Sequence, residues 1–121
     1  MAAQRKLLFL LRHSPYASSL ARSAVDSCLA AAAFEQEVSV LFMGEGVLQL
    51  LPGQDGDAIG TRTLSKIIAS FELYDINQIY ADARALSAHG LNAGLLPPGI
   101  EVVSDQGIRS CLAEADHVLG F

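Results

Sequence analysis

Few residues of the 121-residue chain have side chains suited to covalent or metal chemistry, and they lie far apart. The two cysteines are Cys28 and Cys111. A cysteine thiolate can attack and carry sulfur, but neither cysteine has the C-x-x-C or Cys/His spacing of a zinc site. Both fall in apolar stripes of expected helices, which favours small buried side chains over reactive thiols. We therefore expect no metal site, no cofactor and no catalytic cysteine.

A second candidate is Gly44-Glu45-Gly46, which follows the apolar run 38–42. An apolar run that ends at Gly-x-Gly predicts a buried strand entering a tight turn. Phosphate binding is the weaker interpretation, because the third glycine of a dinucleotide fingerprint is missing and Glu45 is acidic. His13 follows the first apolar run in the same way. In a parallel sheet both loops lie at the carboxyl edge, so His13, Gly44, Glu45 and Gly46 form a candidate ligand edge.

Four apolar residues follow this turn within five positions, before Pro52: Val47, Leu48, Leu50 and Leu51. We expect a short helical turn at 47–51. One face of a short surface helix needs fewer apolar residues, so either the core or another chain covers them. We favour a subunit interface for part of this surface.

The elements that must position these residues alternate between strand and helix. Strands are expected at 6–12, 38–42, 78–81, 100–103 and 117–121, and helices at about 18–34, 64–71, 83–89 and 106–114. The aromatic Phe121 at the end of the last strand is expected to be tucked in. Strand–helix–strand units with right-handed crossovers build a mostly parallel five-stranded sheet between helix layers. The chain is thus predicted to be a single α/β domain spanning residues 1–121.

Three finer expectations concern the last two helices. Asp82 is well placed as the N-cap of the helix at 83–89, where its carboxylate also suits the positive end of the helix dipole. Asp105 is the expected cap of the helix at 106–114. The residues of that helix expected to point inward are Ile108, Cys111 and Leu112.

Composition narrows the class of protein. The net charge is −5 and only 17% of residues are charged, well below the usual quarter. Because the eight Lys and Arg residues are scattered, the chain is not expected to bind nucleic acid directly.

The apolar run 7–11 is too short for a signal peptide, and no stretch is long enough to span a membrane. We expect a cytoplasmic protein with reduced cysteines, part of whose surface is covered by partners.

Three motifs then resemble the TusC/DsrF branch of the DsrE/DsrF-like family, in the family's order and nearly end to end. They are Phe42-x-x-Gly44-Glu45-Gly46-Val47-x-Gln49-Leu50-Leu51-Pro52-Gly53-Gln54, Leu73-Tyr74-Asp75-Ile76 and Asp116-x-Val118-Leu119-x-Phe121. The resemblance implies a DsrE-like three-layer fold. It also implies a hetero-hexamer with TusB-like and TusD-like subunits, which relays persulfide sulfur from a TusA-like carrier to a TusE-like acceptor for 2-thiolation of the tRNA wobble uridine. Related Dsr proteins serve sulfur oxidation instead.

One departure from the family matters for the role of this chain. In the sulfur-carrying subunit the working cysteine follows the third strand, and here that position is Asp82. A carboxylate cannot hold a persulfide, so we expect a non-carrying subunit that supports the partner with the cysteine. Two other hypotheses remain open: a stand-alone small-ligand domain using the His13 and Gly44–Gly46 edge, and an enzyme using Cys111 or His13. Alone, the chain could cover its apolar surface by forming a homo-oligomer.

Overall fold

A computed structural model describes residues 5–12, 20–34, 36–50, 71, 76, 78–91, 94, 96 and 99–121 of the chain. Five strands form one sheet in the order β4-β3-β2-β1-β5. Their bounds are Lys6–Leu11 for β1, Glu37–Phe42 for β2, Gln78–Asp82 for β3, Ile100–Val103 for β4 and His117–Gly120 for β5. All four neighbouring pairs are parallel, which confirms the predicted α/β fold.

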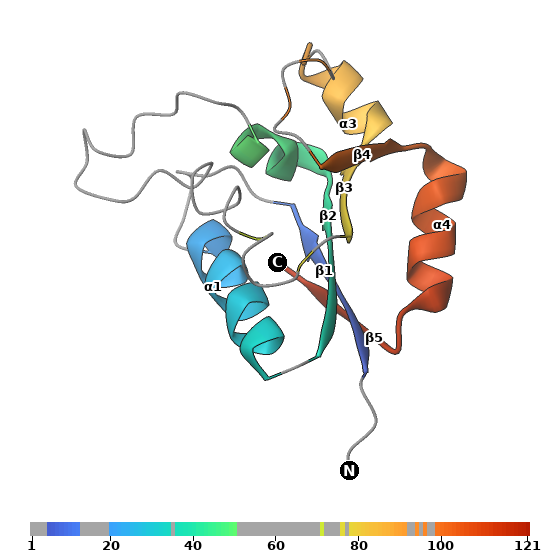
Figure 1. Cartoon of the computed structure of the whole chain (residues 1–121). Helices are drawn as coiled ribbons and strands as arrows, with labels where there is room; N and C mark the ends of the chain where they lie inside the picture. The colour runs from blue at the N-terminus through green and yellow to red at the C-terminus, as the bar shows by residue number, and fades with distance from the viewer. Residues whose placement is uncertain are drawn as a thin grey trace, which may run out of the picture.

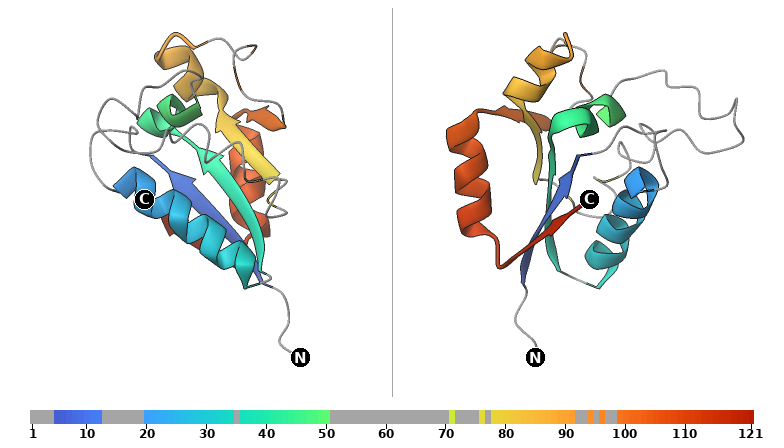
Figure 2. Two further views of the ribbon diagram at one scale, coloured as in Figure 1. Left: turned by 60° about the vertical axis from the view of Figure 1, so that its left-hand side comes forward. Right: turned by 180° about the vertical axis from the view of Figure 1, so that it is seen from behind.

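Helices cover both faces of this sheet. The described helices are α1 (Leu20–Ala33), the 3-10 helix η1 (Gly44–Leu50), α3 (Ala83–Ala88) and α4 (Asp105–Glu114). Helices α1 and α4 lie on opposite sides of the sheet (Figure 1), and the same three layers are visible from two further directions in Figure 2. The helix expected at 64–71 lies outside the described residues apart from Phe71, which is fully buried.

The two faces of the sheet carry cores of different size, because alternate residues of each strand point to opposite faces. The face that α1 covers, called here the α1 face, has the larger cluster of buried residues: Phe9, Leu11, Cys28, Val38, Val40, Phe42, Val47, Phe71, Ile76, Ile79, Ala81, Ala85 and Leu86. The face that α4 covers, the α4 face, buries Leu8, Leu41 and Val103, with Ile108 and Cys111 of α4 packed against them.

Two details of α4 differ from the sequence prediction. The N-cap is Ser104 and not Asp105: the Ser104 hydroxyl accepts from the Gly107 amide at 3.5 Å, while Asp105 already lies inside the first turn. Leu112 does not point inward, since 40% of its surface is exposed. The reason is that α4 packs on the sheet without burying any of its residues completely, so its inward stripe is narrow.

The end of the chain is tied to β1, the strand beside β5. The Phe121 ring stacks on Phe9, with the ring centroids 6.0 Å apart and the ring planes at 7°. The backbone of Phe121 also bonds to β1 and the residue after it, donating to the Leu10 carbonyl at 2.9 Å and accepting from the Arg12 amide at 2.8 Å. The prediction that the aromatic terminus is tucked in is therefore confirmed.

Candidate functional site

The junction between β3 and α3 is built by Asp82. The residue has extended backbone angles (φ −69°, ψ 117°), and its carboxylate accepts a hydrogen bond from the Arg84 amide at 3.0 Å. This satisfies one of the amide groups that a helix start leaves without an intrahelical partner. Asp82 is therefore the N-cap of α3, as the sequence predicted, and its carboxylate is engaged in holding the helix start.

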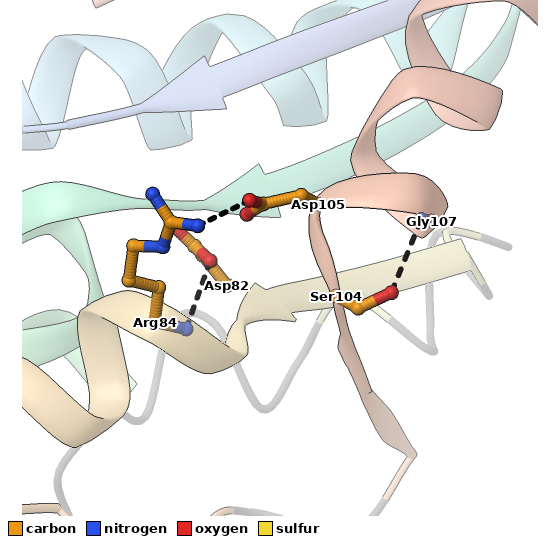
Figure 3. Close-up of polar contacts among 5 residues, drawn as sticks. All are labelled: Asp82, Arg84, Ser104, Asp105 and Gly107. Carbon is orange, nitrogen blue, oxygen red and sulfur yellow. Dashed lines mark hydrogen bonds and ion pairs between the residues drawn. The ribbon is translucent and has the colours of Figure 1, made fainter.

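A second contact connects this junction to α4. The Arg84 guanidinium donates to the Asp105 carboxylate, so the start of α3 is linked to the start of α4 across β3 and β4 (Figure 3). The two side chains are 78% and 51% exposed, and such exposed pairs contribute little net stability because water and salt screen them. The junction is thus a polar, solvent-facing corner without a thiol.

Both thiols of the chain lie elsewhere. Cys28 is fully buried in α1, and desolvation raises the pKa of its thiol to about 12. Cys111 is half-buried in α4; burial and then the nearby carboxylates of Glu114 and Glu101 raise the pKa of its thiol. Because the thiolate is the nucleophilic form, neither cysteine is activated at neutral pH. The expectation that Cys28 is a small core residue is confirmed.

The Gly44-Glu45-Gly46 turn has a backbone explanation. Gly44 has φ +53°, a region that side chains disfavour, and a Cβ on Gly46 would lie 1.8 Å from the Leu11 carbonyl oxygen. The Met43 amide donates to that same carbonyl at 3.0 Å. The two glycines therefore let η1 pack on the carboxyl end of β1, and Glu45 is exposed beside them. His13 lies outside the described residues, so the ligand edge stays a prediction.

The apolar residues after this turn have different environments. The 3-10 helix begins at Gly44, three residues before the predicted start of the helical turn. Val47 is completely buried in the α1-face core, so its assignment to an interface was wrong: the core covers it. Leu48 is half-buried. The side chain of Leu50 and the whole of Leu51 lie outside the described part, and the interface prediction for these three leucines stays a prediction.

A small cavity lies at the other end of the strands, under the last turn of α4. Its volume is about 40 Å³, and its polar lining comes from Lys6, Ser39, Gln78, Tyr80, Cys111 and Glu114. The Ser39 hydroxyl donates to the Gln78 side-chain oxygen at 2.6 Å across paired positions of β2 and β3. Ligand pockets for drug-sized molecules usually exceed about 300 Å³, so this cavity suits water or a small group.

The sequence reasoning missed this cavity. The available signal was the alternation of Gln78, Tyr80 and Asp82, which places three polar side chains on one face of a central strand. Desolvation, followed by the charges of Cys111, Glu101 and Glu114, raises the pKa of the Tyr80 hydroxyl. The Tyr80 hydroxyl and the Cys111 thiol are therefore protonated near neutral pH, and neither acts as a general base there.

Metal-binding clusters and membrane-spanning helices are both absent from the part of the chain that the structure describes. Among these residues, no three His, Cys, Asp or Glu side chains gather closely enough to hold a metal ion. Within the same part of the chain, no helix combines the length and apolar character needed to cross a membrane.

Fold and site together define an α/β protein in which a capped helix, and no thiol, follows the third strand. The sequence model of the DsrE/DsrF-like family matches residues 5–121, and the chain belongs to this family. Among its relatives, a protein named "Protein TusC homolog" from Vibrio parahaemolyticus is 33% identical over 96% of this chain and 98% of its own length. The "Intracellular sulfur oxidation protein DsrF" of Allochromatium vinosum is 39% identical over 97% of this chain and 96% of its own length.

Solved structures support the fold independently. The crystal structure of the YchN protein from E. coli superposes with a TM-score of 0.87, covering 98% of this chain and all of that chain. The two sequences are 17% identical, so the likeness concerns the fold alone.

The family match and the named relatives confirm that the motifs resembling the TusC/DsrF branch are family signals. The chain is therefore a member of a sulfur-relay family.

Proposed function

We propose that the chain is a non-carrying subunit of a TusBCD-type sulfurtransferase complex that relays persulfide sulfur for 2-thiolation of the tRNA wobble uridine. In this role it joins TusB-like and TusD-like subunits in a cytoplasmic hetero-hexamer. It meets the TusA-like and TusE-like sulfur carriers indirectly, through its partners, and does not bind tRNA itself.

The main support for the proposal is that Asp82, and not a cysteine, stands at the start of α3. A relay subunit needs a low-pKa thiol at an accessible helix start, whereas the start of α3 holds a carboxylate that caps the helix. The pKa values of the Cys28 and Cys111 thiols are raised and not lowered. The chain therefore contributes shape and contacts to a partner that supplies the thiol.

A sulfur-loading experiment tests this role. The chain is co-purified with the subunits encoded beside its gene, the complex is loaded by a persulfide donor, and each intact subunit is weighed by mass spectrometry. We expect the added sulfur on a partner subunit with a cysteine after its third strand. A complex containing Cys28→Ala and Cys111→Ala in this chain should load to the same extent.

Two results would contradict the proposal. One is a stable persulfide on Cys28 or Cys111 of this chain that is needed for onward transfer. The other is a chain that native mass spectrometry finds alone, or assembled without those neighbours; this result would favour a stand-alone ligand-binding domain at the Gly44–Gly46 edge.

A second candidate is the same structural role in a Dsr-type complex of sulfur oxidation. It is favoured by the DsrF relative, whose identity of 39% exceeds the 33% of the TusC homologue. Deletion of the gene separates the two roles: loss of 2-thiouridine from tRNA supports the first, and loss of growth on reduced sulfur compounds with intact thiolation supports the second.

A further inference from the structure

The strand β5 is an edge strand with little protection against pairing. Among the described strands it pairs with β1 alone, and all four of its residues are exposed. Val118 and Leu119 expose 44% and 39% of their surface on opposite faces, and the strand contains no Lys, Glu, Asp or Pro. The opposite edge, β4, carries the charged Glu101. Because proteins usually protect open edges with charge or proline, β5 is the edge suited to receive another strand.

The backbone of β5 shows which groups face outward. Phe121 bonds towards β1 through both its amide and its carbonyl. Since these groups alternate in direction along a strand, the amides and carbonyls of Val118 and Gly120 point away from β1. Within the described residues, none of the hydrogen bonds outside the sheet ladder involves Val118 or Gly120. An incoming strand would find two donors and two acceptors.

Opposite charges mark the two ends of this edge. At the carboxyl end, the Arg12 Nη2 lies 3.3 Å from where a Cβ on Gly120 would stand, so the guanidinium lies over the end of β5. Arg12 is exposed and forms no ion pair within the described ranges. At the amino end, the Asp116 carboxylate precedes β5 and accepts from the Lys6 amide at 2.8 Å. A strand running in the opposite direction with the same sequence would bring these charges together.

We propose that β5 pairs antiparallel with β5 of a second copy of this chain around a two-fold axis that passes beside Val118. Val118 then faces itself across the axis, and their side chains cover each other. Gly120 of each copy lies opposite Asp116 of the other, which places each Arg12 guanidinium beside an Asp116 carboxylate. The contact joins two five-stranded sheets into one, and because it is isologous it closes at two copies.

The expected strength follows from the size of the contact. Four residues of strand bury less surface than the roughly 1,200 Å² of a stable interface, so the isolated chain should dimerise reversibly and only at high concentration. In an assembly with other contacts between the same two copies, this edge would act as one part of a larger interface. The inference does not depend on the proposed sulfur relay.

The test is self-association of the purified full-length chain by sedimentation over a wide concentration range. Val118→Pro removes an outward amide and should weaken the dimer at least tenfold, whereas Val118→Thr keeps the amide and should retain it. Proline is tolerated at an outward edge position, and circular dichroism checks that each variant is folded. Dimerisation unchanged by Val118→Pro would overturn the proposal.

A charge change gives a second, independent measurement that does not alter the strand. Arg12→Glu should weaken the dimer about tenfold, because the new carboxylate would face Asp116 of the second copy. Arg84→Glu makes the same change in charge near the far edge of the sheet and should leave dimerisation unchanged. Equal effects of both variants, or a chain that stays monomeric at every concentration, would overturn the proposal.

Covalent trapping identifies the occupant. In a Cys111→Ser background, Val118→Cys should form a disulfide-linked homodimer under mild oxidation, while Val102→Cys on β4 should not. The experiment is repeated with the subunits encoded beside the gene. If the Val118→Cys variant cross-links to one of those subunits, in place of a second copy, the homotypic pairing is contradicted.

Discussion

The two faces of the sheet use the same strands but are covered very differently. On the α1 face, side chains such as Phe42, Val40 and Cys28 are completely removed from water. On the α4 face the buried cluster is small, polar side chains line a cavity, and Leu112 and Val118 remain about two-fifths exposed. We expect the α1 face to supply most of the stability, because the α4 face and its edge β5 leave more apolar surface in water.

The two cysteines reflect this difference between the faces. Burial dominates the raised pKa of Cys28, and the pKa of Cys111 is raised by partial burial together with two carboxylates. The thiol of Cys28 thus lies in a fully buried, apolar environment, and the thiol of Cys111 lies in a partly exposed, polar one. Each face can be perturbed separately, and the expected effects differ in size.

The largest effect is expected from truncating the α1-face core. Phe42→Ala should lower the free energy of unfolding by about 3–5 kcal/mol, because it leaves a cavity in a close-packed region. Leu112→Ala on the α4 face should cost less than about 1 kcal/mol, since much of that side chain is already in water. Urea unfolding monitored by circular dichroism measures both. Similar losses for the two variants would refute the proposed division between the faces.

A smaller effect concerns the pH dependence of stability. The pKa of Cys28 is raised to about 12 in the folded chain from an ordinary value near 8.5 in the unfolded chain. The stabilisation from its protonated thiol is therefore complete below about pH 8.5 and is lost as the pH rises towards 12. Between about pH 9 and pH 10 the wild type should lose roughly 1.2 kcal/mol more stability than Cys28→Ala.

The control for this measurement is Cys111→Ser. Because Cys111 is only partly buried, its replacement should change the pH dependence much less than replacement of Cys28. Unfolding by urea at fixed pH steps from about 8 to 10 provides the data, and lysine or tyrosine titrations common to all variants cancel in the differences. Parallel curves for the wild type and Cys28→Ala would show that Cys28 is not desolvated.

The smallest effects are expected at the polar corner beside α3. Asp82→Ala removes the N-cap and should cost about 1 kcal/mol. Arg84→Ala breaks only an exposed ion pair and should cost less than about 0.5 kcal/mol, an effect that disappears in high salt. Thermal unfolding in low and high salt separates the two contributions. A larger loss for Arg84 than for Asp82 would make the ion pair, and not the cap, the main support of the corner.

Much of the fold could be predicted from local patterns. The apolar runs at 7–11 and 38–42 indicated strands, and the cap at Asp82 marked the start of a helix. The start of α4, in contrast, was predicted one residue too late. By sequence Asp105 is a fair cap, but in the structure the Ser104 hydroxyl accepts from the Gly107 amide and Ser104 is the N-cap.

The site was predictable only in part, since an excess of apolar residues does not reveal what covers them. Val47 and Leu48 are neighbours with the same apolar character, yet one is fully buried in the core and the other half-buried. The cavity under α4 is lined by residues from three strands and a helix. Residue spacing within any one of these elements does not predict that they meet.

The sequence by itself determined the order of the elements, the period of their apolar residues, the family, and the absence of a cysteine at the end of β3. These follow from backbone preferences and side-chain types, which act within a few residues. Tertiary structure alone decided that α4 is the described helix opposite α1, that Gly46 must fit against Leu11, and that Arg12 lies over Gly120. These contacts depend on which segments pack together, because they join residues that are far apart in the sequence.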